Sequence, residues 1–318
     1  MTVTRRDFAK SMFIIKNKKI FIIISIVLVL LSIVSLSIFG LRVGIDFKGG
    51  ALTEVVYKDA RPAQTDLNSS LEALDIGSVL LQPTGDAGYI VKSRDLNEAE
   101  HNLLLKTLSL GHSPTGEAQD GQSVLEEKSF NSIGPSVGRE LTKKAIIAVI
   151  LVSLGIILFI AYAFRKVSKP ISSWKYGFMA VISLLHDVII PVGLFSMLSH
   201  YYGAELDTLF VVAVLTILGL SVSDTIVVFD RIRENLKNRV ETSFNETVGK
   251  SLEQSYVRSI STSLTVILVL LSLVFFGPTS TKYFALMLTA GMFFGTYSSI
   301  FLASPLLVLM EEWQAKKK

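Results

Sequence analysis

Six long apolar stretches constrain this chain more than any other feature of its sequence. They are Ile20–Gly40, Ala145–Phe164, Gly177–Ser199, Thr208–Phe229, Ser255–Phe276 and Tyr283–Met310. Each holds about twenty residues or more, enough for an α-helix to cross the roughly 30 Å hydrocarbon core of a bilayer. The first stretch is too long for the apolar core of a cleaved signal peptide, and no A-x-A site follows it. The sequence therefore predicts an all-α membrane bundle of six transmembrane helices.

The composition agrees with a membrane protein and removes several functional classes. Of the 318 residues, 50% are hydrophobic, and the mean hydropathy is +0.52. The chain has no cysteine, which excludes disulfides and thiolate sites. Its net charge of +4 follows from basic loops beside membrane helices, so we expect no binding to nucleic acid.

Basic residues gather in four segments that alternate with acidic or nearly neutral loops. They are Arg5, Arg6, Lys10, Lys16, Lys18 and Lys19, then Arg165, Lys166, Lys169 and Lys175, then Arg231, Arg233, Lys237, Arg239 and Lys250, and finally Lys316, Lys317 and Lys318. Because cytoplasmic loops carry the excess of Lys and Arg, we expect both termini in the cytoplasm. The expected parts are a cytoplasmic interfacial segment (1–19), a first span (20–40), an extracytoplasmic domain (41–144), spans two to six (145–310) and a cytoplasmic tail (311–318).

The segment between the first two spans has the composition of a soluble domain. Ala51–Lys58 alternates like a strand, and Gln64–Leu74 carries leucines on one helical face. Two short runs around residues 84–86 predict a hairpin, Leu96–Leu110 predicts a second helix, and a last strand is expected from Gln122. The order β-α-β-β-α-β is the α+β arrangement known as ferredoxin-like.

Two shorter segments carry helix signals beside the spans. The residues from Ser243 to Glu246 match a capping box, and a similar helix is expected to begin at Thr4. Each segment could lie on the cytoplasmic face as an interfacial helix. The simpler interpretation, which we favour, is that each leads the chain into the next span.

Four ionisable residues fall inside the expected spans: His186, Asp187, Asp224 and Arg258. A carboxylate at mid-membrane costs roughly 2.5–3.5 kcal/mol on insertion scales, so such residues are usually functional. Asp224 is too short to reach the headgroups and is the best candidate for carrying a proton. Arg258 lies at a similar depth in the next span, where it either pairs with Asp224 or extends to the headgroups. His186 and Asp187 either join the proton relay or fix helix packing.

Small and polar residues surround these positions. Ser221, Ser223, Thr225 and Thr262 are expected to line a polar seam between spans four and five. Gly291 and Gly295 form a small-xxx-small stripe in the last span, and Gly219 begins a shorter one in span four. Such stripes let helices approach closely, either within the bundle or against a partner subunit.

The two membrane aspartates also suggest a protease, but other residues argue against an enzyme. Membrane aspartyl proteases carry a Gly-x-Gly-Asp motif, whereas Asp224 follows Ser221, Val222 and Ser223. The sequence holds no metal-ligand spacing, phosphate-binding loop or serine-nucleophile motif. We therefore expect no catalytic residues, no metal and no cofactor.

Four motifs resemble those of a known family. They are GIDFKGG (Gly44–Gly50), SIGPSVGREL (Ser132–Leu141), LLHDVIIPVG (Leu184–Gly193) and LGLSVSDTIVVFDRIREN (Leu218–Asn235). They lie in order along nearly the whole chain, and the last is highly specific. On these residues the chain resembles the SecF family, the smaller membrane subunits of bacterial SecD–SecF protein-export complexes. That family belongs to the resistance-nodulation-division superfamily of proton-coupled transporters.

The resemblance implies a function and partners that composition and spacing do not reveal. It implies a multi-pass protein of the bacterial inner membrane that uses the proton-motive force to help export unfolded polypeptides through the SecYEG channel, after the SecA motor has acted. The expected partners are a SecD-like six-span subunit, SecYEG, accessory proteins such as YajC and YidC, secreted polypeptide and membrane lipids. Asp224 would be the relay carboxylate and Arg258 its partner, with protons as the expected coupling ion and sodium as the open alternative. Ser223 and Leu220 depart from the Asn and Tyr common in the family.

Two other functions remain open on the sequence alone. One is a proton-coupled exporter half for a lipid or small molecule, as found elsewhere in the superfamily. The other is a non-transporting membrane scaffold, whose buried charges only hold helices together. A scaffold would keep its function when Asp224 becomes Asn.

Overall fold

A computed structural model describes residues 5–58, 61–110 (except 73, 75 and 78), 125–163 and 172–316. The chain divides into two compact units, one of Met1–Arg42 with Ile147–Lys318 and one of Val43–Ile146. The expected basic loop at 165–169, the helix stop at Gly111 and the strand start at Gln122 lie outside the described residues.

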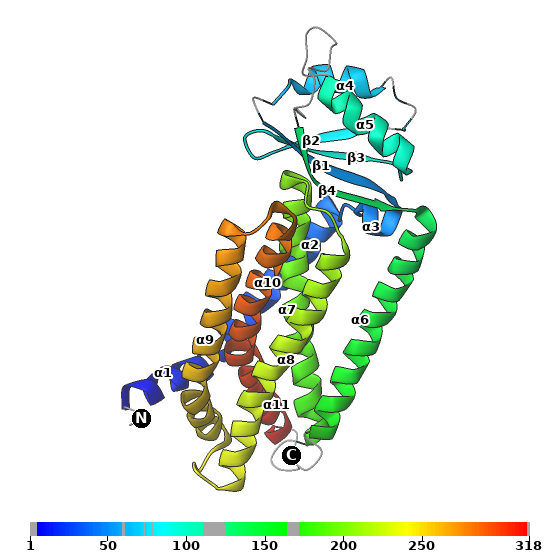
Figure 1. The fold of residues 1–318 in the computed structure, drawn as a ribbon. Coiled ribbons are helices and arrows are strands. Elements are labelled where there is room, and N and C mark those ends of the chain that lie inside the picture. The colour runs from blue at the N-terminus through cyan, green and yellow to red at the C-terminus, as the bar shows by residue number, and fades with distance from the viewer. Residues whose placement is uncertain are drawn as a thin grey trace. The chain divides into compact units, whose positions relative to one another are not determined.

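The first unit is built from long helices (Figure 1). They are α1 (Arg5–Lys16), α2 (Lys18–Phe39), α6 (Pro135–Ala163, which begins in the second unit), α7 (Ser173–Tyr202), α8 (Thr208–Lys237), α9 (Phe244–Phe276), α10 (Thr279–Ser298), η1 (Ser299–Ala303) and α11 (Ser304–Ala315). Six helices of the described chain are long and apolar enough to cross a membrane, counting α10, η1 and α11 as one. The six expected spans are therefore present. The last is interrupted by the π-helix η1, which the sequence pattern did not predict.

The core of this unit lies among α7, α8, α10 and α11. Tyr176 and Phe229 are fully buried and meet edge to face, with ring centroids 5.6 Å apart at 84°. α10 packs against α7, α8 and α9. By contrast, α6 and α9 bury few of the residues in their apolar stretches inside this chain, as expected of helices whose solvent is lipid.

Small residues let α2 approach α7 closely. A Cβ at Gly193 would stand 2.4 Å from Ser32 Cβ, so only glycine fits there. Ser35 Oγ lies 2.9 Å from the Gly193 carbonyl oxygen and 2.7 Å from Ser196 Oγ. Lipid is as apolar as leucine, so close packing and interhelical hydrogen bonds are what hold such helices together.

The expected packing glycines divide into two groups. A Cβ at Gly291 would meet Ile217 at 2.3 Å, and one at Gly295 would meet Ser221 at 3.4 Å. Both glycines therefore serve the contact of α10 with α8. Of the two roles considered for Gly219, packing within this chain is not observed, because nothing lies within 4 Å of its Cβ position. Gly219 lies on a face of α8 that this chain leaves open.

The two segments with helix signals behave differently. The capping box at Ser243 and Glu246 is present, and its helix continues unbroken through Phe276 as α9. That segment leads the chain into a span, as favoured from the sequence. At the amino end, α1 is a separate helix that stops before Asn17 and packs against α9. There the interpretation we favoured is wrong.

The second unit is a four-stranded antiparallel sheet with α4 and α5 on one face (Figure 1). Its elements are α3 (Ile45–Lys48), β1 (Gly50–Tyr57), α4 (Gln64–Glu72), β2 (Leu80–Thr84), β3 (Gly88–Ser93), α5 (Glu98–Leu110) and β4 (Leu125–Ile133). The strand order is β2-β3-β1-β4. Gly49 and Gly50 enter β1 with φ of 82° and 142°, values that glycine adopts readily. The sequence pattern did not predict α3.

The core of the second unit lies between the sheet and α4 and α5. It is formed by Val55, Tyr57, Leu67, Leu71, Tyr89, Val91, Leu104, Leu108 and their neighbours. The Tyr57 hydroxyl donates to the Leu108 carbonyl at 3.1 Å, and burial raises the pKa of the Tyr57 phenol well above its ordinary value. This hydrogen bond ties β1 to the end of α5.

The contact of α2 with α7 leads to a prediction about stability. Gly193→Ala places a methyl group against Ser32, so we expect it to destabilise the bundle by about 1–3 kcal/mol. Gly155→Ala is the matched control, because nothing lies within 4 Å of that position in α6 and alanine favours helix. Thermal melting in detergent micelles measures both. Equal melting temperatures for the two variants would contradict the packing argument.

Candidate functional site

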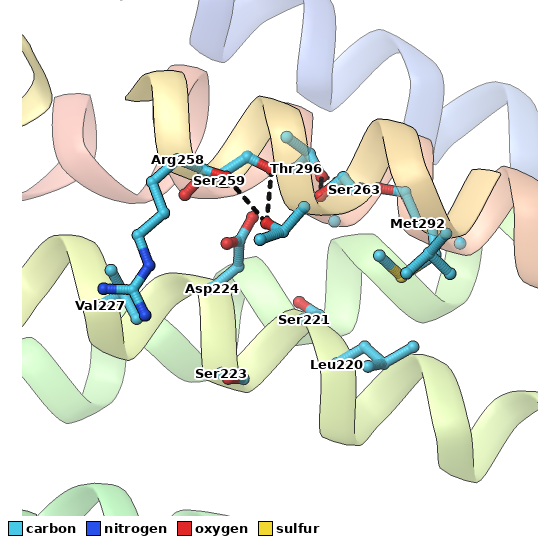
Figure 2. Close-up of a pocket in the computed structure, with 14 residues that line it drawn as sticks. Leu220, Ser221, Ser223, Asp224, Val227, Arg258, Ser259, Ser263, Met292 and Thr296 are labelled. Atoms are coloured by element: carbon cyan, nitrogen blue, oxygen red, sulfur yellow. Dashed lines mark hydrogen bonds between the residues drawn. The ribbon is translucent and has the colours of Figure 1, made fainter. Parts of the chain in front are cut away.

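The first part of the site is an open pocket around Asp224. The cavity has a volume of about 200 Å³. It is lined by Leu220, Ser221, Ser223, Asp224 and Val227 of α8, Arg258, Ser259, Thr262, Ser263 and Val266 of α9, and Gly291, Met292, Gly295 and Thr296 of α10. Figure 2 shows the Asp224 carboxylate pointing from α8 toward α9. Ser299 Oγ lies 3.5 Å from Asp224 Oδ2, and Ser259 also stands beside the carboxylate.

Arg258 lines the same pocket without pairing with the carboxylate. Its guanidinium lies next to Val227, away from Asp224 (Figure 2). Among the ion pairs of the described residues, none joins Asp224 to Arg258. The two opposite charges predicted to meet therefore share a pocket but stand apart in this structure. Their pairing in a second conformation stays a prediction.

The second part of the site is a hydrogen-bonded cluster around Asp187, which is fully buried. His186 Nδ1 lies 2.9 Å from Asp187 Oδ1. Two hydroxyls donate to the other oxygen, Oδ2: Ser298 Oγ at 2.7 Å and Ser221 Oγ. The cluster thereby joins α7, α8 and α10. Buried polar groups of this kind are costly unless satisfied, and here the carboxylate is well supplied with partners.

The cluster has two further features. Ser183 Oγ donates to Ser298 Oγ at 3.0 Å, which extends the network along α7. The other ring nitrogen of His186, Nε2, is buried and has no hydrogen-bond partner among the described residues. The ring stacks loosely with Tyr297, at a centroid distance of 6.1 Å and 20°.

The predicted polar seam is split between these two parts. Ser221 belongs to both, because it lines the pocket and also donates to Asp187. Ser223 and Thr262 line the pocket, and Thr262 donates to the backbone of its own helix. Thr225 is buried in α8 and is not among the pocket residues. The pocket walls still present six hydroxyl side chains to Asp224 and Arg258.

Sequence reasoning missed Ser298 and Ser299 as partners of the carboxylates. Ser298 contacts Asp187 and Ser299 contacts Asp224, although the serines are neighbours in the chain. The available signal was weak, a pair of serines inside an apolar span just after Gly295. Their role depends on which helices lie beside α10, which a single sequence does not reveal. Among the described residues, His, Asp and Glu form no group of three suited to a metal ion.

Comparisons with known proteins point to one family. A profile of the family described as protein export membrane protein SecD/SecF, C-terminal, matches residues 116–313. The chain is 40% identical over 309 residues to the protein translocase subunit SecF of Thermobaculum terrenum, covering 94% of this chain and 93% of that protein. It is 32% identical over 304 residues to the protein translocase subunit SecDF of Bacillus subtilis, covering 95% of this chain.

The fold is similar to that of a solved structure. The crystal structure of SecDF from Thermus thermophilus, a translocon-associated membrane protein, matches with a TM-score of 0.74 and 29% identity. The match covers 94% of this chain. The chain spans 38% of the length of both SecDF proteins, the solved one and the one from Bacillus subtilis.

The unequal surroundings of the two aspartates lead to a prediction. Asp187→Ala removes the carboxylate that accepts from Ser298 and Ser221 and that faces His186 Nδ1, so we expect a loss of about 1–3 kcal/mol in stability. Asp224→Ala removes one long contact and should change stability less. Thermal melting of the purified chain in detergent compares the two. A larger loss for Asp224→Ala would mean that the cluster around Asp187 is not what stabilises the bundle.

Proposed function

This chain belongs to the SecD/SecF family of protein-export membrane proteins, and we propose that, as a SecF-like accessory subunit of the protein translocase, it couples proton movement to polypeptide export. The observation that carries the coupling is the Asp224 pocket. A carboxylate in a membrane span, open to a cavity that serine and threonine residues help to line and unpaired with the arginine in the same cavity, is arranged to take up and release a proton.

The proposed cycle has two states. In one, Arg258 swings onto Asp224 and stabilises the charged carboxylate; in the other, the two separate and the carboxylate takes up a proton. The separated arrangement of this structure fits the second state. A proton that crosses the full membrane potential supplies about 2.3 kcal/mol per 100 mV, which biases a two-state equilibrium about fiftyfold.

The cycle neither makes nor breaks a covalent bond in the exported polypeptide, and it requires no bound cofactor. We propose that the chain is not an enzyme and that the coupling ion is a proton. Sodium is the alternative ion, and replacing it in the transport buffer distinguishes the two. The polar walls of the pocket leave room for water, through which a proton reaches Asp224 from outside.

The open face of α8 supports a partnership. Gly219 has nothing within 4 Å of its Cβ position, and Ser223, which lines the pocket, is exposed, so this face of α8 beside the pocket is uncovered within this chain. We propose that a SecD-like six-span subunit closes it, packed about a pseudo-twofold axis along the membrane normal. Relatives named SecDF carry a much longer single chain, which agrees with two such halves acting together. SecYEG and the accessory proteins YajC and YidC are proposed further partners.

The orientation and location are part of the same proposal. The chain is a multi-pass membrane protein, and we place it in the bacterial inner membrane with both termini in the cytoplasm. Basic residues such as Arg231, Arg233 and Lys237 at the end of α8 support this orientation. The unit Val43–Ile146 would then lie outside the cytoplasm.

We propose that the external unit is ferredoxin-like and binds unfolded polypeptide. The order β1-α4-β2-β3-α5-β4, with β2-β3-β1-β4 across the antiparallel sheet, supports the label. Its two edges differ. β2 contains Pro83, which cannot donate to an added strand, whereas β4 is a nine-residue edge without proline. An extended polypeptide can add to such an edge through backbone hydrogen bonds.

The alternatives are weaker on the same observations. A lipid or small-molecule exporter would share the Asp224 pocket, but the family match is to protein-export subunits. A scaffold would explain Asp187, whose oxygens are well supplied with partners, yet it gives no reason for a carboxylate left in an open pocket.

Removing the titrating group of Asp224 tests the coupling. Asp224→Asn keeps the shape of the side chain, so we expect normal assembly and loss of the export stimulated by a proton gradient. Asp230→Asn is the matched control, because it makes the same change six residues later on α8 at an exposed position. Export into inverted membrane vesicles, with and without a gradient, measures the effect. Wild-type stimulation in Asp224→Asn would place the relay elsewhere, with Asp187 the next candidate.

The two sheet edges can be compared directly. A photo-crosslinking amino acid at Lys128 on β4 should capture a polypeptide arrested during export, because its exposed side chain lies on the open edge. The same probe at Leu80 on β2, also exposed, should capture less. Equal capture, or none at either edge, would remove β4 from polypeptide binding.

A further inference from the structure

Two neighbouring serines each contact one of the two membrane carboxylates. Ser298, the last residue of α10, donates to Asp187 Oδ2 on α7 at 2.7 Å. Ser299, the first residue of η1, lies 3.5 Å from Asp224 Oδ2 on α8. Both serines are fully buried. Consecutive residues of a helix point in different directions, which lets one short segment contact acidic groups on two different helices.

Each serine hydroxyl also has a second acceptor in its own helix. Ser298 Oγ lies 3.0 Å from the Gly295 carbonyl oxygen, and Ser299 Oγ lies 3.0 Å from that of Thr296. A hydroxyl carries one proton, so it donates fully either to the carboxylate or to the carbonyl. Each serine hydroxyl can therefore donate to either of two acceptors, a carboxylate on another helix or a backbone carbonyl of its own helix.

The backbone at this point is unusual. η1 is a π-helix of five residues inside a membrane span, and such segments are rare and concentrated at functional sites. Pro305 follows at the start of α11 and has no N–H to continue the helical ladder. Ser304 Oγ donates instead to the Ser299 carbonyl at 3.1 Å, five residues back. The segment that carries Ser299 is thus held differently from a regular helix.

Proton uptake on Oδ2 of Asp187 would disturb this arrangement. Its Oδ2 already accepts from Ser298 and Ser221, and its Oδ1 faces His186 Nδ1. A proton placed on Oδ2 takes a lone-pair position that a serine hydroxyl now occupies, so one hydroxyl must turn away. Ser298 can then donate to the Gly295 carbonyl, its other acceptor. Ser221 is itself one of the residues that line the Asp224 pocket.

We propose that Ser298 and Ser299 are positioning residues that couple the protonation of Asp187 to that of Asp224 through the start of the π-helix. When one carboxylate changes its charge, its serine changes acceptor, the segment shifts, and the neighbouring serine changes its contact with the other carboxylate. Asp187 thereby becomes a second proton-binding residue, and its proton affinity depends on the charge of Asp224. The inference rests on the proposed relay at Asp224, which it deepens.

Infrared difference spectroscopy of the full chain in lipid nanodiscs tests the coupling without measuring export. The carboxyl and carboxylate bands of each residue are assigned with Asp187→Asn and Asp224→Asn and followed through a pH titration. We expect Asp224→Asn to change the proton affinity of Asp187 by about 2- to 30-fold. In a chain that also carries Ser298→Ala and Ser299→Ala, this change should shrink markedly, because only direct repulsion between the charges remains.

A control and three outcomes complete the test. Ser255→Ala removes a buried hydroxyl whose hydrogen bond goes to the Ser251 carbonyl, and should leave the coupling unchanged. The inference is overturned if Asp187 does not titrate, if Asp224→Asn leaves its affinity unchanged, or if the coupling persists undiminished without the two serines. Normal export by Asp224→Asn would instead overturn the proposed function, so the two failures are distinguishable.

Discussion

The absence of water from the hydrocarbon core is the constraint on which the rest of this structure depends. A polar group there must find its partner inside the protein. Asp187 meets this requirement with His186 and with hydroxyls from α8 and α10. The same hydrogen bonds hold three helices together, so a residue that is costly to bury also defines how the bundle packs.

The two aspartates show how environment separates chemical roles. Asp187 is fully buried and well supplied with hydrogen bonds, which makes it a structural centre. Asp224 is half-buried, weakly bound to Ser299 and open to a pocket, which leaves its charge free to change. Identical side chains on neighbouring helices thus differ in role: Asp187 holds three helices together and, in our inference, responds to the proton that Asp224 carries.

Small residues make this arrangement possible. Gly291 and Gly295 bring α10 against α8, and Gly193 brings α2 against α7. Without these close approaches, Ser298 and Ser299 could not reach carboxylates on α7 and α8. The contrast with Gly219, which faces open space, separates packing within this chain from the surface that we assign to a partner.

The six spans, the four membrane charges and the β-α-β-β-α-β order were all predictable from the sequence. Each depends on local properties: the length of an apolar run, the cost of a charge within it, and the alternation of a strand. The tertiary structure decided what no local pattern contains. It placed Ser298 beside Asp187 and turned Arg258 away from Asp224. It also left Gly219 without a packing neighbour and formed a π-helix shortly before Pro305. These outcomes depend on which helices become neighbours and how each is rotated, because apolar side chains around a membrane helix look alike in sequence until packing selects one face.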